Sequence, residues 1–369
     1  MTSGQGGPLT GLRIVEIDAI GPVPLAAMIM ADMGADIIRV GRRATPGKSM
    51  WDDVGGAVLH RSRDHVALDL KDPADRDALL EVVDRADGLI EGFRPGVMER
   101  LGLGPDVCLA RNPKLVFGRM TGWGQNGPMA MRAGHDINYL SLTGALHAIG
   151  DAGAPPTVPL NLVGDYGGGT MFLVAGMLAA FLAAQRTGRG QVVDVAIADG
   201  TGTLLSLFHA WLGTGVWSDR RADNLLDGGA PFYRCYECAD GRHVAVGCLE
   251  PQFFGAMVAG LGLEDRCYDQ GDRAGWPAME ADFAATFATR PRDAWAVLFA
   301  PTDACVTPVL SLTEAIDHPQ AVGRGSFVVC DGIAQAVPAP RFTNTPAAIK
   351  DRNEVDLAEV LARWRGKTG

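Results

Sequence analysis

The sequence has 369 residues, of which 47% are hydrophobic and 21% are charged, as expected for a soluble globular protein large enough for two domains. Its net charge of −10 at pH 7 argues against nucleic acid as a partner, because nucleic-acid-binding domains present basic surfaces. Any anionic ligand would have to be bound by a local group of arginines.

Cysteine usage and hydropathy indicate where the protein works. The seven cysteines are an odd number, spread along the chain without a signal peptide, so we expect a reducing, cytoplasmic setting. The one CxxC motif, Cys235 to Cys238, has no second pair of ligands nearby, and we expect no metal site. The longest uncharged apolar run, 170–184, is shorter than the roughly 20 residues that span a bilayer, so we expect a buried helix and no membrane span.

The first half of the chain alternates predicted strands and helices. The predicted elements are a strand over 12–17, a turn at 21–24, a helix over 25–33, a strand over 35–40, a strand over 65–70, a helix over 73–86, a strand over 88–93, a short helix near 96–101 and a strand over 115–123. Nearly all of the strands are apolar, which is typical of a parallel sheet buried on both faces. We therefore predict an α/β fold with a doubly wound parallel sheet.

The second half has a different pattern, which predicts a smaller α+β domain. The predicted elements are helices at 137–149, 170–184 and 200–213, a hairpin over 231–248 around Asp240 and Gly241, a helix over 251–262, a helical stretch over 278–300 and a strand over 305–310. The predicted domains are a large one over 1–200 with 326–369, a linker helix region over 201–224 and a small one over 225–325. The Pro-rich tail is expected to run back over the large domain.

Basic residues follow several predicted strands. In a dinucleotide-binding βαβ unit an acidic residue after the second strand holds a ribose, whereas Arg39, Arg42 and Arg43 occupy that region here. The first turn also lacks the G-x-G-x-x-G pattern, which disfavours a nicotinamide cofactor. Later elements end in further basic residues, namely Arg61, Arg63, Lys71, Arg94 and Arg100. They could lie along the carboxyl edge of a parallel sheet and bind a phosphate-bearing ligand, or they could be solvated surface arginines.

Three titratable residues are candidates for chemistry. His135 and Asp136 precede a predicted helix, whose first backbone N–H groups could stabilise an oxyanion. Asp165 precedes three glycines and an apolar helix, where desolvation would raise the pKa of its carboxyl group. Glu250 lies at a strand-to-helix junction. The alternatives are a capping or packing role for His135, an N-cap role for Asp165, and a first-turn carboxylate role for Glu250.

Several motifs resemble those of one enzyme family. GHDINY, NLVGDYGGG, MTGWGQNGP, EGFRPG, ALDLK and LDGGAPFY are similar to motifs of the α-methylacyl-CoA racemases, a branch of the family III CoA-transferase superfamily, and of its bacterial members in particular. The resemblance extends along nearly the whole chain. It implies an acyl-CoA substrate, no separate cofactor, and an interlocked homodimer with its active site at the subunit interface.

The resemblance also implies roles for individual residues. His135 and Asp165 would be the catalytic bases, Asp136 would begin the helix that stabilises the oxyanion, and Glu250 would hydrogen-bond the histidine of the other subunit. The implied coenzyme A contacts are Arg42, Leu68, Asp69, Leu70, Lys71, Gly92, Phe93, Arg94, Arg100, Gly134, Ile137, Asn138 and Tyr139.

The sequence departs from its relatives near the adenine end of this implied site. His60 to Arg63 replace an Asn-Arg-Gly-Lys-like stretch, and Gly41 replaces an acid that is common after the second strand. Met129 and Met131 would either shape an acyl-binding surface or pack in the core.

The expected reaction interconverts (2R)- and (2S)-2-methylacyl-CoA thioesters. Moving a proton from one face of a carbon to the other requires two acid/base groups, and His135 and Asp165 would be that pair. The alternative enzyme is a CoA-transferase in which Asp165 attacks the thioester as a nucleophile. A coenzyme A-binding module without chemistry is the third interpretation.

Overall fold

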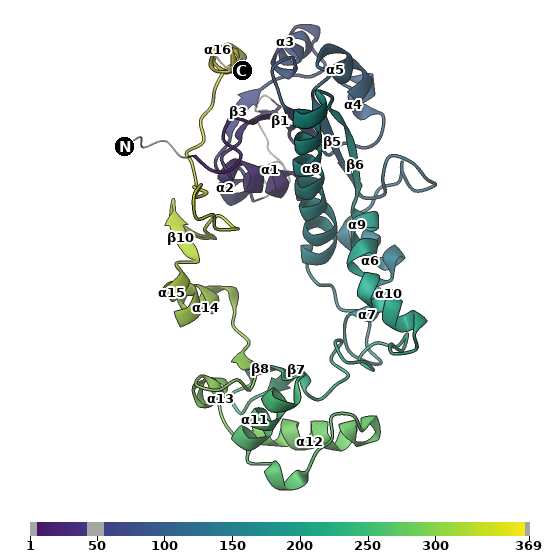
Figure 1. The fold of residues 1–369 in the computed structure, drawn as a ribbon, viewed down its shortest axis with the longest axis vertical. Helices are drawn as coiled ribbons and strands as arrows, with labels where there is room; N and C mark the ends of the chain where they lie inside the picture. The colour runs from purple at the N-terminus through teal and green to yellow at the C-terminus, as the bar shows by residue number, and fades with distance from the viewer. Residues whose placement is uncertain (1–5, 43–54, 366–369) are drawn as a thin grey trace. The chain divides into compact units, whose positions relative to one another are not determined.

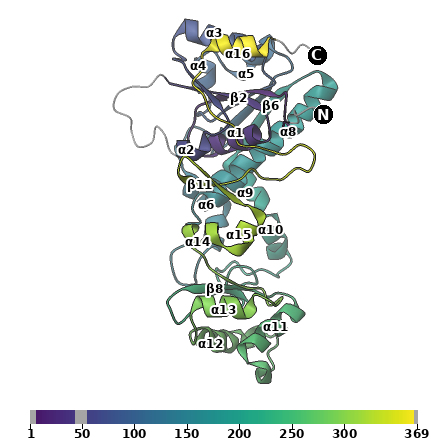
Figure 2. The ribbon, with the colours of Figure 1, turned by 90° about the vertical axis from the view of Figure 1, so that its left-hand side faces the viewer.

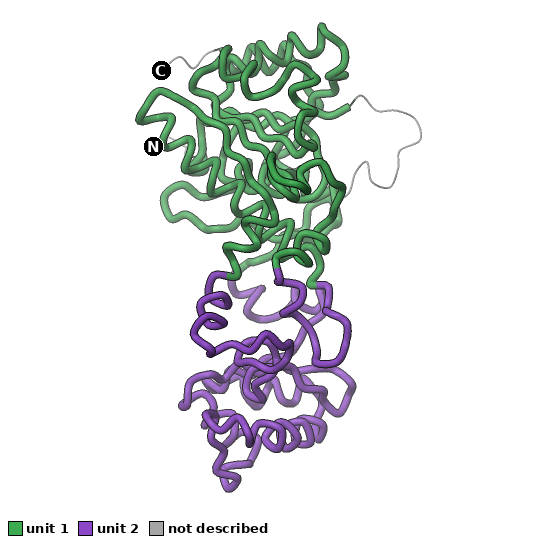
Figure 3. The backbone as a smooth tube through the Cα atoms, turned by 90° about the vertical axis from the view of Figure 1, so that its right-hand side faces the viewer, with its two compact units in different colours: residues 1–143, 159–205, 325–369 green, residues 144–158, 206–324 purple. Residues whose placement is uncertain are grey.

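The computed structural model describes residues 6–42 and 55–365 (Figure 1). Arg43, one of the predicted anion-binding arginines, lies outside the described residues. The chain divides into two compact units, shown in Figure 3. Unit 1 comprises residues 1–143, 159–205 and 325–369, and unit 2 comprises residues 144–158 and 206–324. These units differ from the predicted domains at 144–158, which the prediction assigns to the large domain, and at 201–224, which it assigns to a linker helix region.

Unit 1 is built on a six-stranded parallel sheet. Its strands are β1 (Arg13–Ile17), β2 (Asp36–Gly41), β3 (Asp64–Ala67), β4 (Gly88–Glu91), β5 (Val116–Thr121) and β6 (Gln191–Ala196). Their order across the sheet is β3-β2-β1-β4-β5-β6. This is the doubly wound order in which the chain reverses its direction of progress between β1 and β4. The predicted fold class is confirmed.

Helices cover both faces of this sheet because alternate strand residues point to opposite faces. Ile14 and Ile90 belong to an apolar cluster with α1 (Pro22–Asp32) and α8 (Met171–Thr187). Val15 and Leu89, which are the neighbours of Ile14 and Ile90 along their strands, belong to a second cluster on the other face. That face is covered by α3 (Pro73–Val83), α4 (Val97–Arg100), α5 (Pro105–Arg111) and α16 (Leu357–Trp364). Figure 2 shows α16 beside α3 on one side of the sheet, with α1 and α8 on the other.

The predicted turn at residues 21–24 is wrong, because α1 already begins at Pro22. Proline suits the first turn of a helix, where its missing N–H group would have no intrahelical partner and its fixed φ is already helical. Gly21 precedes this helix with a φ of 84°, a conformation that favours glycine. The turn after β1 is therefore very short, and α1 begins close to the carboxyl edge of the sheet.

The apolar helix predicted over 170–184 is much longer than expected. A π-helical segment, η1 (Leu162–Thr170), runs directly into α8, so that one helix extends over 26 residues. By length and composition alone this helix could cross a membrane, a test that the core helix of a soluble protein also passes. It contributes Leu173, Val174 and Met177 to the apolar cluster against the sheet. We therefore describe it as a core helix of unit 1.

Two other predicted helices are each divided into two. The helix expected over 137–149 consists of α6 (Asp136–Thr143) and α7 (Ala145–Ala148), because Gly144 adopts a left-handed conformation with a φ of 87°. The helix expected over 200–213 consists of α9 (Ile197–Leu204) and α10 (Ser206–Gly213). The edge strand β6 was not predicted; half of its residues are exposed, and Gln191 and Asp194 interrupt its apolar run.

Unit 2 has the predicted α+β character. Its antiparallel strands are β7 (Tyr233–Glu237), β8 (His243–Gly247) and β9 (Val306–Pro308), and its longer helices are α11 (Pro251–Leu261), α12 (Trp276–Phe287) and α13 (Arg292–Phe299). The predicted hairpin around Asp240 and Gly241 is confirmed. Unit 2 also contains α7, α10 and the shorter helical segments η2 (Glu264–Arg266), η3 (Arg273–Gly275), α14 (Leu312–Asp317) and α15 (Pro319–Arg324).

The C-terminal tail returns to unit 1, as expected. It carries the hairpin of β10 (Phe327–Cys330) and β11 (Ile333–Ala336) before α16. The buried Arg61 guanidinium, just after α2 (Gly56–Leu59), binds Asp32 of α1 at 2.6 Å and the Gln335 side chain of β11 at 2.7 Å. This network fastens the tail to the large unit.

Candidate active site at the carboxyl edge of the sheet

The sheet order defines where a ligand would bind. In doubly wound proteins the loops on either side of the reversal point separate and leave a crevice at the carboxyl ends of the strands. Here the reversal lies between β1 and β4, which pair in register through Ile14 to Glu16 and Gly88 to Ile90. The loop after β1 leads to Gly21, and the loop after β4 contains Gly92, Phe93 and Arg94.

Asp165 lies at this edge. It is half-buried within η1, and a Cβ placed on Gly21 would lie 3.4 Å from Asp165 Oδ2. Its backbone N–H donates to Asp136 Oδ1 at 2.6 Å, and its carboxyl group is hydrogen-bonded to the Asn161 side chain. The N-cap interpretation is wrong, because Asp165 lies inside a helical segment and Thr170 is the residue that precedes α8.

The environment of Asp165 favours its neutral form. Burial raises the pKa of this carboxyl group to about 6, and the nearby negative charge of Asp136 adds to the shift. The hydrogen bond with Asn161 and the proximity of His135 oppose it. The predicted effect of desolvation is therefore present. A carboxyl group with this pKa can be populated in both protonation states near neutral pH.

His135 immediately precedes α6. Its carbonyl oxygen accepts the N–H groups of Asn138 and Tyr139, while its own N–H donates to Asn138 Oδ1 at 3.0 Å. This backbone arrangement starts the helix and leaves the exposed imidazole out of the core. The helix begins at Asp136, one residue earlier than predicted. The N–H groups of Asp136 and Ile137 thus lie in the first turn, where an α-helix provides no internal acceptor.

Tyr139 supports the loop that carries His135. Its hydroxyl group donates to the Gly134 carbonyl oxygen, and its ring meets Trp123 edge-on, with the ring centroids 4.8 Å apart. A Cβ on Gly122 would overlap the Tyr139 ring, and one on Gly134 would lie 2.8 Å from it. Burial raises the pKa of the Tyr139 hydroxyl group to about 12, so this group remains a donor. Asn138 and Tyr139, implied as ligand contacts, therefore also hold the backbone around His135.

The predicted basic residues divide into two groups. Arg42, Lys71, Arg94 and Arg100 are exposed, and the first three follow the carboxyl ends of β2, β3 and β4. Arg61 and Arg63 are buried, so the interpretation as solvated surface arginines is wrong for them. Arg61 pairs with Asp32, and the Nε atom of Arg63 lies 3.2 Å from Glu16 Oε2. Arg39 faces Asp18 at 3.6 Å.

The remaining implied coenzyme A contacts belong to the same loops or lie close to them. Leu68 is buried in the apolar cluster below the edge, whereas Asp69 and Lys71 are exposed and Leu70 is half-buried. The Phe93 N–H donates to the buried Glu91 carboxylate at 2.6 Å, which fixes the start of the loop after β4. Gly134 and Ile137 lie at the start of α6. Sheet topology thus brings most of these residues to one edge.

Glu250 and the two methionines have different surroundings. Glu250 belongs to unit 2 and precedes α11; it is exposed, and its side chain makes no capping hydrogen bond within the described part of the chain. Its carboxylate is thus not engaged in capping that helix. Met131 is 61% exposed, so core packing is excluded for this residue, while Met129 is half-buried.

Three site residues were missed by sequence analysis. Asn161 binds Asp165, Gly21 faces it, and Gly122 accommodates Tyr139. Asn161 and Gly122 lie inside the motifs NLVGDYGGG and MTGWGQNGP, but their spacing alone gives no sign of the contacts. Gly21 follows the first strand directly, and only its place beside Pro22 suggests a special backbone conformation.

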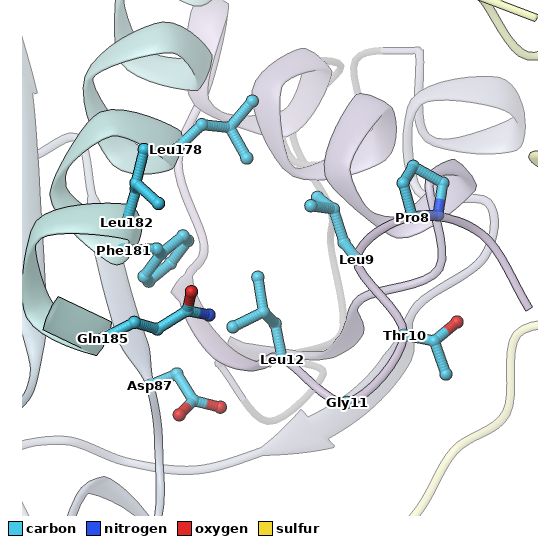
Figure 4. Close-up of a pocket in the computed structure, with 10 residues that line it drawn as sticks. All are labelled: Pro8, Leu9, Thr10, Gly11, Leu12, Asp87, Leu178, Phe181, Leu182 and Gln185. Atoms are coloured by element: carbon cyan, nitrogen blue, oxygen red, sulfur yellow. The ribbon is translucent and has the colours of Figure 1, made fainter. Parts of the chain in front are cut away.

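A separate hollow of about 440 Å³ lies at the opposite edge of the sheet, near the amino ends of β1 and β4 (Figure 4). Leu9 and Leu12 face Phe181 of α8 across it, and Asp87 lies at its rim. It contains none of the predicted site residues. Within residues 6–42 and 55–365, no group of three or more His, Cys, Asp or Glu side chains is placed to hold a metal ion.

The sheet order defines a doubly wound α/β protein in which His135, Asp165 and several exposed cations follow or lie near the carboxyl ends of the strands. A model of the CoA-transferase family III matches residues 9–354, and the chain belongs to this family. It is 42% identical to the α-methylacyl-CoA racemase of Mus musculus over 95% of this chain and 91% of that protein. The human protein of the same name is also 42% identical, over 92% of this chain and 87% of that protein.

The fold is shared with solved structures of the family. A CAIB/BAIF family protein from Brucella suis superimposes with a TM-score of 0.82, covering 98% of this chain and 100% of that one, at 24% sequence identity. This likeness extends over both units.

Proposed function

We propose that the chain is a racemase that interconverts (2R)- and (2S)-2-methylacyl-CoA thioesters through an enolate. The observation that carries this proposal is the hydrogen bond from the Asp165 N–H to Asp136 Oδ1, because Asp136 directly follows His135 in the chain. This bond ties the η1 backbone at Asp165 to the start of α6 beside His135, which supports the pair as the two acid/base groups. The 42% identity to two α-methylacyl-CoA racemases supports the same substrate class.

The reaction uses the two groups in opposite protonation states. In one direction the neutral imidazole of His135 takes the α-proton, and the electron pair of the broken C–H bond moves to the thioester oxygen as an enolate. The protonated carboxyl group of Asp165 then donates a proton to the opposite face of the carbon. In the other direction the Asp165 carboxylate removes the proton and the His135 imidazolium donates one. A pKa of about 6 for Asp165 suits both roles.

The enolate oxygen requires hydrogen-bond donors. The N–H groups of Asp136 and Ile137 at the start of α6 are suited to this role, and one such donor contributes on the order of 3 kcal/mol in comparable sites. The exposed Arg42, Lys71, Arg94 and Arg100 would bind the phosphates of coenzyme A. Because the reacting carbon belongs to the thioester and both proton carriers belong to the chain, we propose that no separate cofactor takes part.

We further propose a homodimer of interlocked protomers in which Glu250 of one protomer supports His135 of the other. Exposed apolar side chains on each unit support an extensive contact between copies. Unit 1 exposes Leu142, Leu160 and Leu204, and unit 2 exposes Leu207, Leu212 and Val216. The seven unpaired cysteines support a reducing, cytoplasmic setting.

The rival function is CoA transfer with Asp165 as the nucleophile, which is favoured by the family match itself. A nucleophilic carboxylate would form a mixed anhydride with the acyl group and release the CoA thiolate. A raised pKa works against this reaction, because it reduces the fraction of Asp165 that is ionised at neutral pH.

The deciding experiment follows the α-hydrogen of (2R)-2-methylacyl-CoA in deuterated water by NMR or mass spectrometry. A racemase incorporates one deuterium and inverts the centre, whereas the His135→Ala, Asp165→Asn double variant does neither. If the double variant exchanged at the wild-type rate, the assignment of the two bases would be wrong. Hydroxylamine trapping of an aspartyl adduct during turnover, together with no solvent exchange, would establish the transferase instead.

A further inference from the structure

A carboxylate at the start of α6 binds the backbone of η1. Asp136 Oδ1 accepts the Asp165 N–H at 2.6 Å, and the same carboxylate accepts the Gly164 N–H. Asp136 is 8% exposed, and its Oδ2 atom has no hydrogen-bond partner among the described residues. The two N–H groups of η1 are therefore the polar anchor of this buried side chain.

The Asp136 side chain connects the two proposed proton carriers, His135 and Asp165, through one peptide bond and one hydrogen bond. Asp136 follows His135 directly in the chain, and one of its hydrogen bonds ends on the backbone of Asp165. A path that passes through one side chain leaves little freedom for the two helices to slide past each other. Proton transfer on both faces of one carbon depends steeply on such spacing, since a misplacement of about 1 Å can cost about 100-fold in rate.

We propose that the Asp136 side chain is a positioning residue that sets the separation between the His135 imidazole and the Asp165 carboxyl group. This role belongs to the carboxylate and is distinct from that of the Asp136 backbone N–H. The inference rests on the proposed racemase function, since it assigns the spacing of that reaction's two acid/base groups to one residue.

The alternative is that Asp136 only stabilises the start of its own helix, as acidic residues in a first turn do. The contacts argue against it, because both hydrogen-bond donors belong to η1 and neither belongs to α6. The packing agrees, since a Cβ on Gly164 would overlap Asp136 Oδ1. The two segments can approach this closely only because residue 164 has no side chain.

The charge of Asp136 has a second effect, on the titration of Asp165. The groups that influence Asp165 are Asp136 and His135 beside α6 and Asn161 at the start of η1. Burial makes the largest contribution to its raised pKa, and the charge of Asp136 adds to it. Removing that charge while keeping the hydrogen-bond acceptor should therefore lower the pKa of Asp165.

Two variants separate positioning from simple structural support. Asp136→Asn keeps an oxygen acceptor and removes the charge, whereas Asp136→Ala removes both. We expect Asp136→Ala to lower kcat for solvent deuterium exchange by about 100-fold with little change in KM. We expect Asp136→Asn to lose less activity and to shift the rise of kcat with pH, in the direction that uses Asp165 as the base, to lower pH.

Asp356→Asn is the matched control, because Asp356 caps α16 by accepting the Glu359 N–H at 2.8 Å and lies outside the proposed site. It should leave kcat and the pH profile unchanged. Wild-type protein without exchange would overturn the racemase proposal itself. Exchange by the wild type, combined with a wild-type kcat in folded Asp136→Ala, would overturn the positioning role. If Asp136→Ala does not fold, a wild-type kcat in Gly164→Ala, whose added methyl group displaces η1 from the Asp136 carboxylate, would overturn it instead. An unchanged pH profile in Asp136→Asn would overturn the effect of the Asp136 charge on Asp165.

Discussion

Gly164 and Asp136 approach each other so closely that residue 164 has no room for a side chain, because a Cβ there would overlap Asp136 Oδ1. This contact brings η1 against the start of α6. About one turn further along η1, Gly168 packs against Gly200 of α9, and neither residue has room for a Cβ. Glycines thus allow the π-helical segment to pack closely against both α6 and α9.

Gly164→Ala should therefore disable the enzyme by moving Asp165. The added methyl group pushes η1 away from Asp136, and we expect a loss of about 100-fold in kcat for deuterium exchange. Overpacking at such a site costs about 1–3 kcal/mol of stability, which thermal unfolding would measure. Gly323→Ala is the control, since Gly323 is exposed in α15 and a Cβ there meets nothing within 4 Å. Wild-type kinetics in Gly164→Ala would contradict the close contact.

The decrease in rate at acidic pH should reflect protonation of Asp165. In the direction that uses Asp165 as the base, only the carboxylate is active, so kcat should rise as pH increases through about 6. The opposite direction needs the same pair of groups with one proton between them, carried by Asp165 instead of His135, so kcat/KM should have the same pH profile in both directions. Initial rates from each pure enantiomer across pH 4.5 to 8.5 would test this. A kcat/KM profile that does not fall below pH 6 would argue against Asp165 as one of the two carriers.

The same raised pKa has a consequence for stability, with a defined sign. Because the folded-state pKa lies above the unfolded value, folding favours the protonated form, and stability falls as pH rises from about 4 to above 6. Asp165→Asn should then raise the unfolding free energy at pH 8 by about 1 kcal/mol, after discounting for solvent screening at a half-buried site. The gain should vanish near pH 3.5. Melting curves at both pH values measure the difference, and an equal gain at both would contradict it.

Features that depend on residues adjacent in sequence could be predicted, whereas features that depend on packing between distant residues could not. The parallel strands were predictable because β1, β2 and β4 each contain consecutive Ile, Val or Leu residues, and His135 and Asp165 were found from their motifs. The extension of α8 through η1 was not predictable, because a glycine-rich stretch is not typical of a helix. The glycines of η1 pack closely against Asp136, Thr201 and Gly200, which are distant in sequence from some of them. The burial of Arg61 and Arg63 depends on partners distant in sequence, such as Gln335, so no pattern near residue 61 indicates it.

The two groups of arginines should respond differently to substitution. Arg61→Ala leaves Asp32 buried without its cation, and breaking such a pair costs about 3–5 kcal/mol of stability. Its effect should appear in urea unfolding, while the affinity of the folded protein for coenzyme A stays unchanged.

Arg94→Ala provides the comparison, because Arg94 is exposed after β4 and belongs to the proposed phosphate contacts. It should weaken coenzyme A binding by about 10-fold, since a charge-assisted hydrogen bond contributes about 1.5–3 kcal/mol, without changing the unfolding midpoint by more than a degree or two. Calorimetric titration with coenzyme A measures the first effect. Loss of affinity in folded Arg61→Ala would place Arg61 in the site after all.

The interlocked dimer can be tested by mixing two inactive variants. His135→Ala lacks the imidazole, and Glu250→Ala lacks the proposed support from the partner, so each homodimer should have at most a few per cent of wild-type kcat, in line with the 100-fold cost of losing geometry at a reacting group. If Glu250 acts across the interface, a mixed dimer has one site with both defects and one site with neither. Activity should therefore reappear on refolding or co-expressing the two chains, approaching half of the wild-type value per mixed dimer. If Glu250 served the histidine of its own chain, every site in the mixture would carry one defect, and no activity would return.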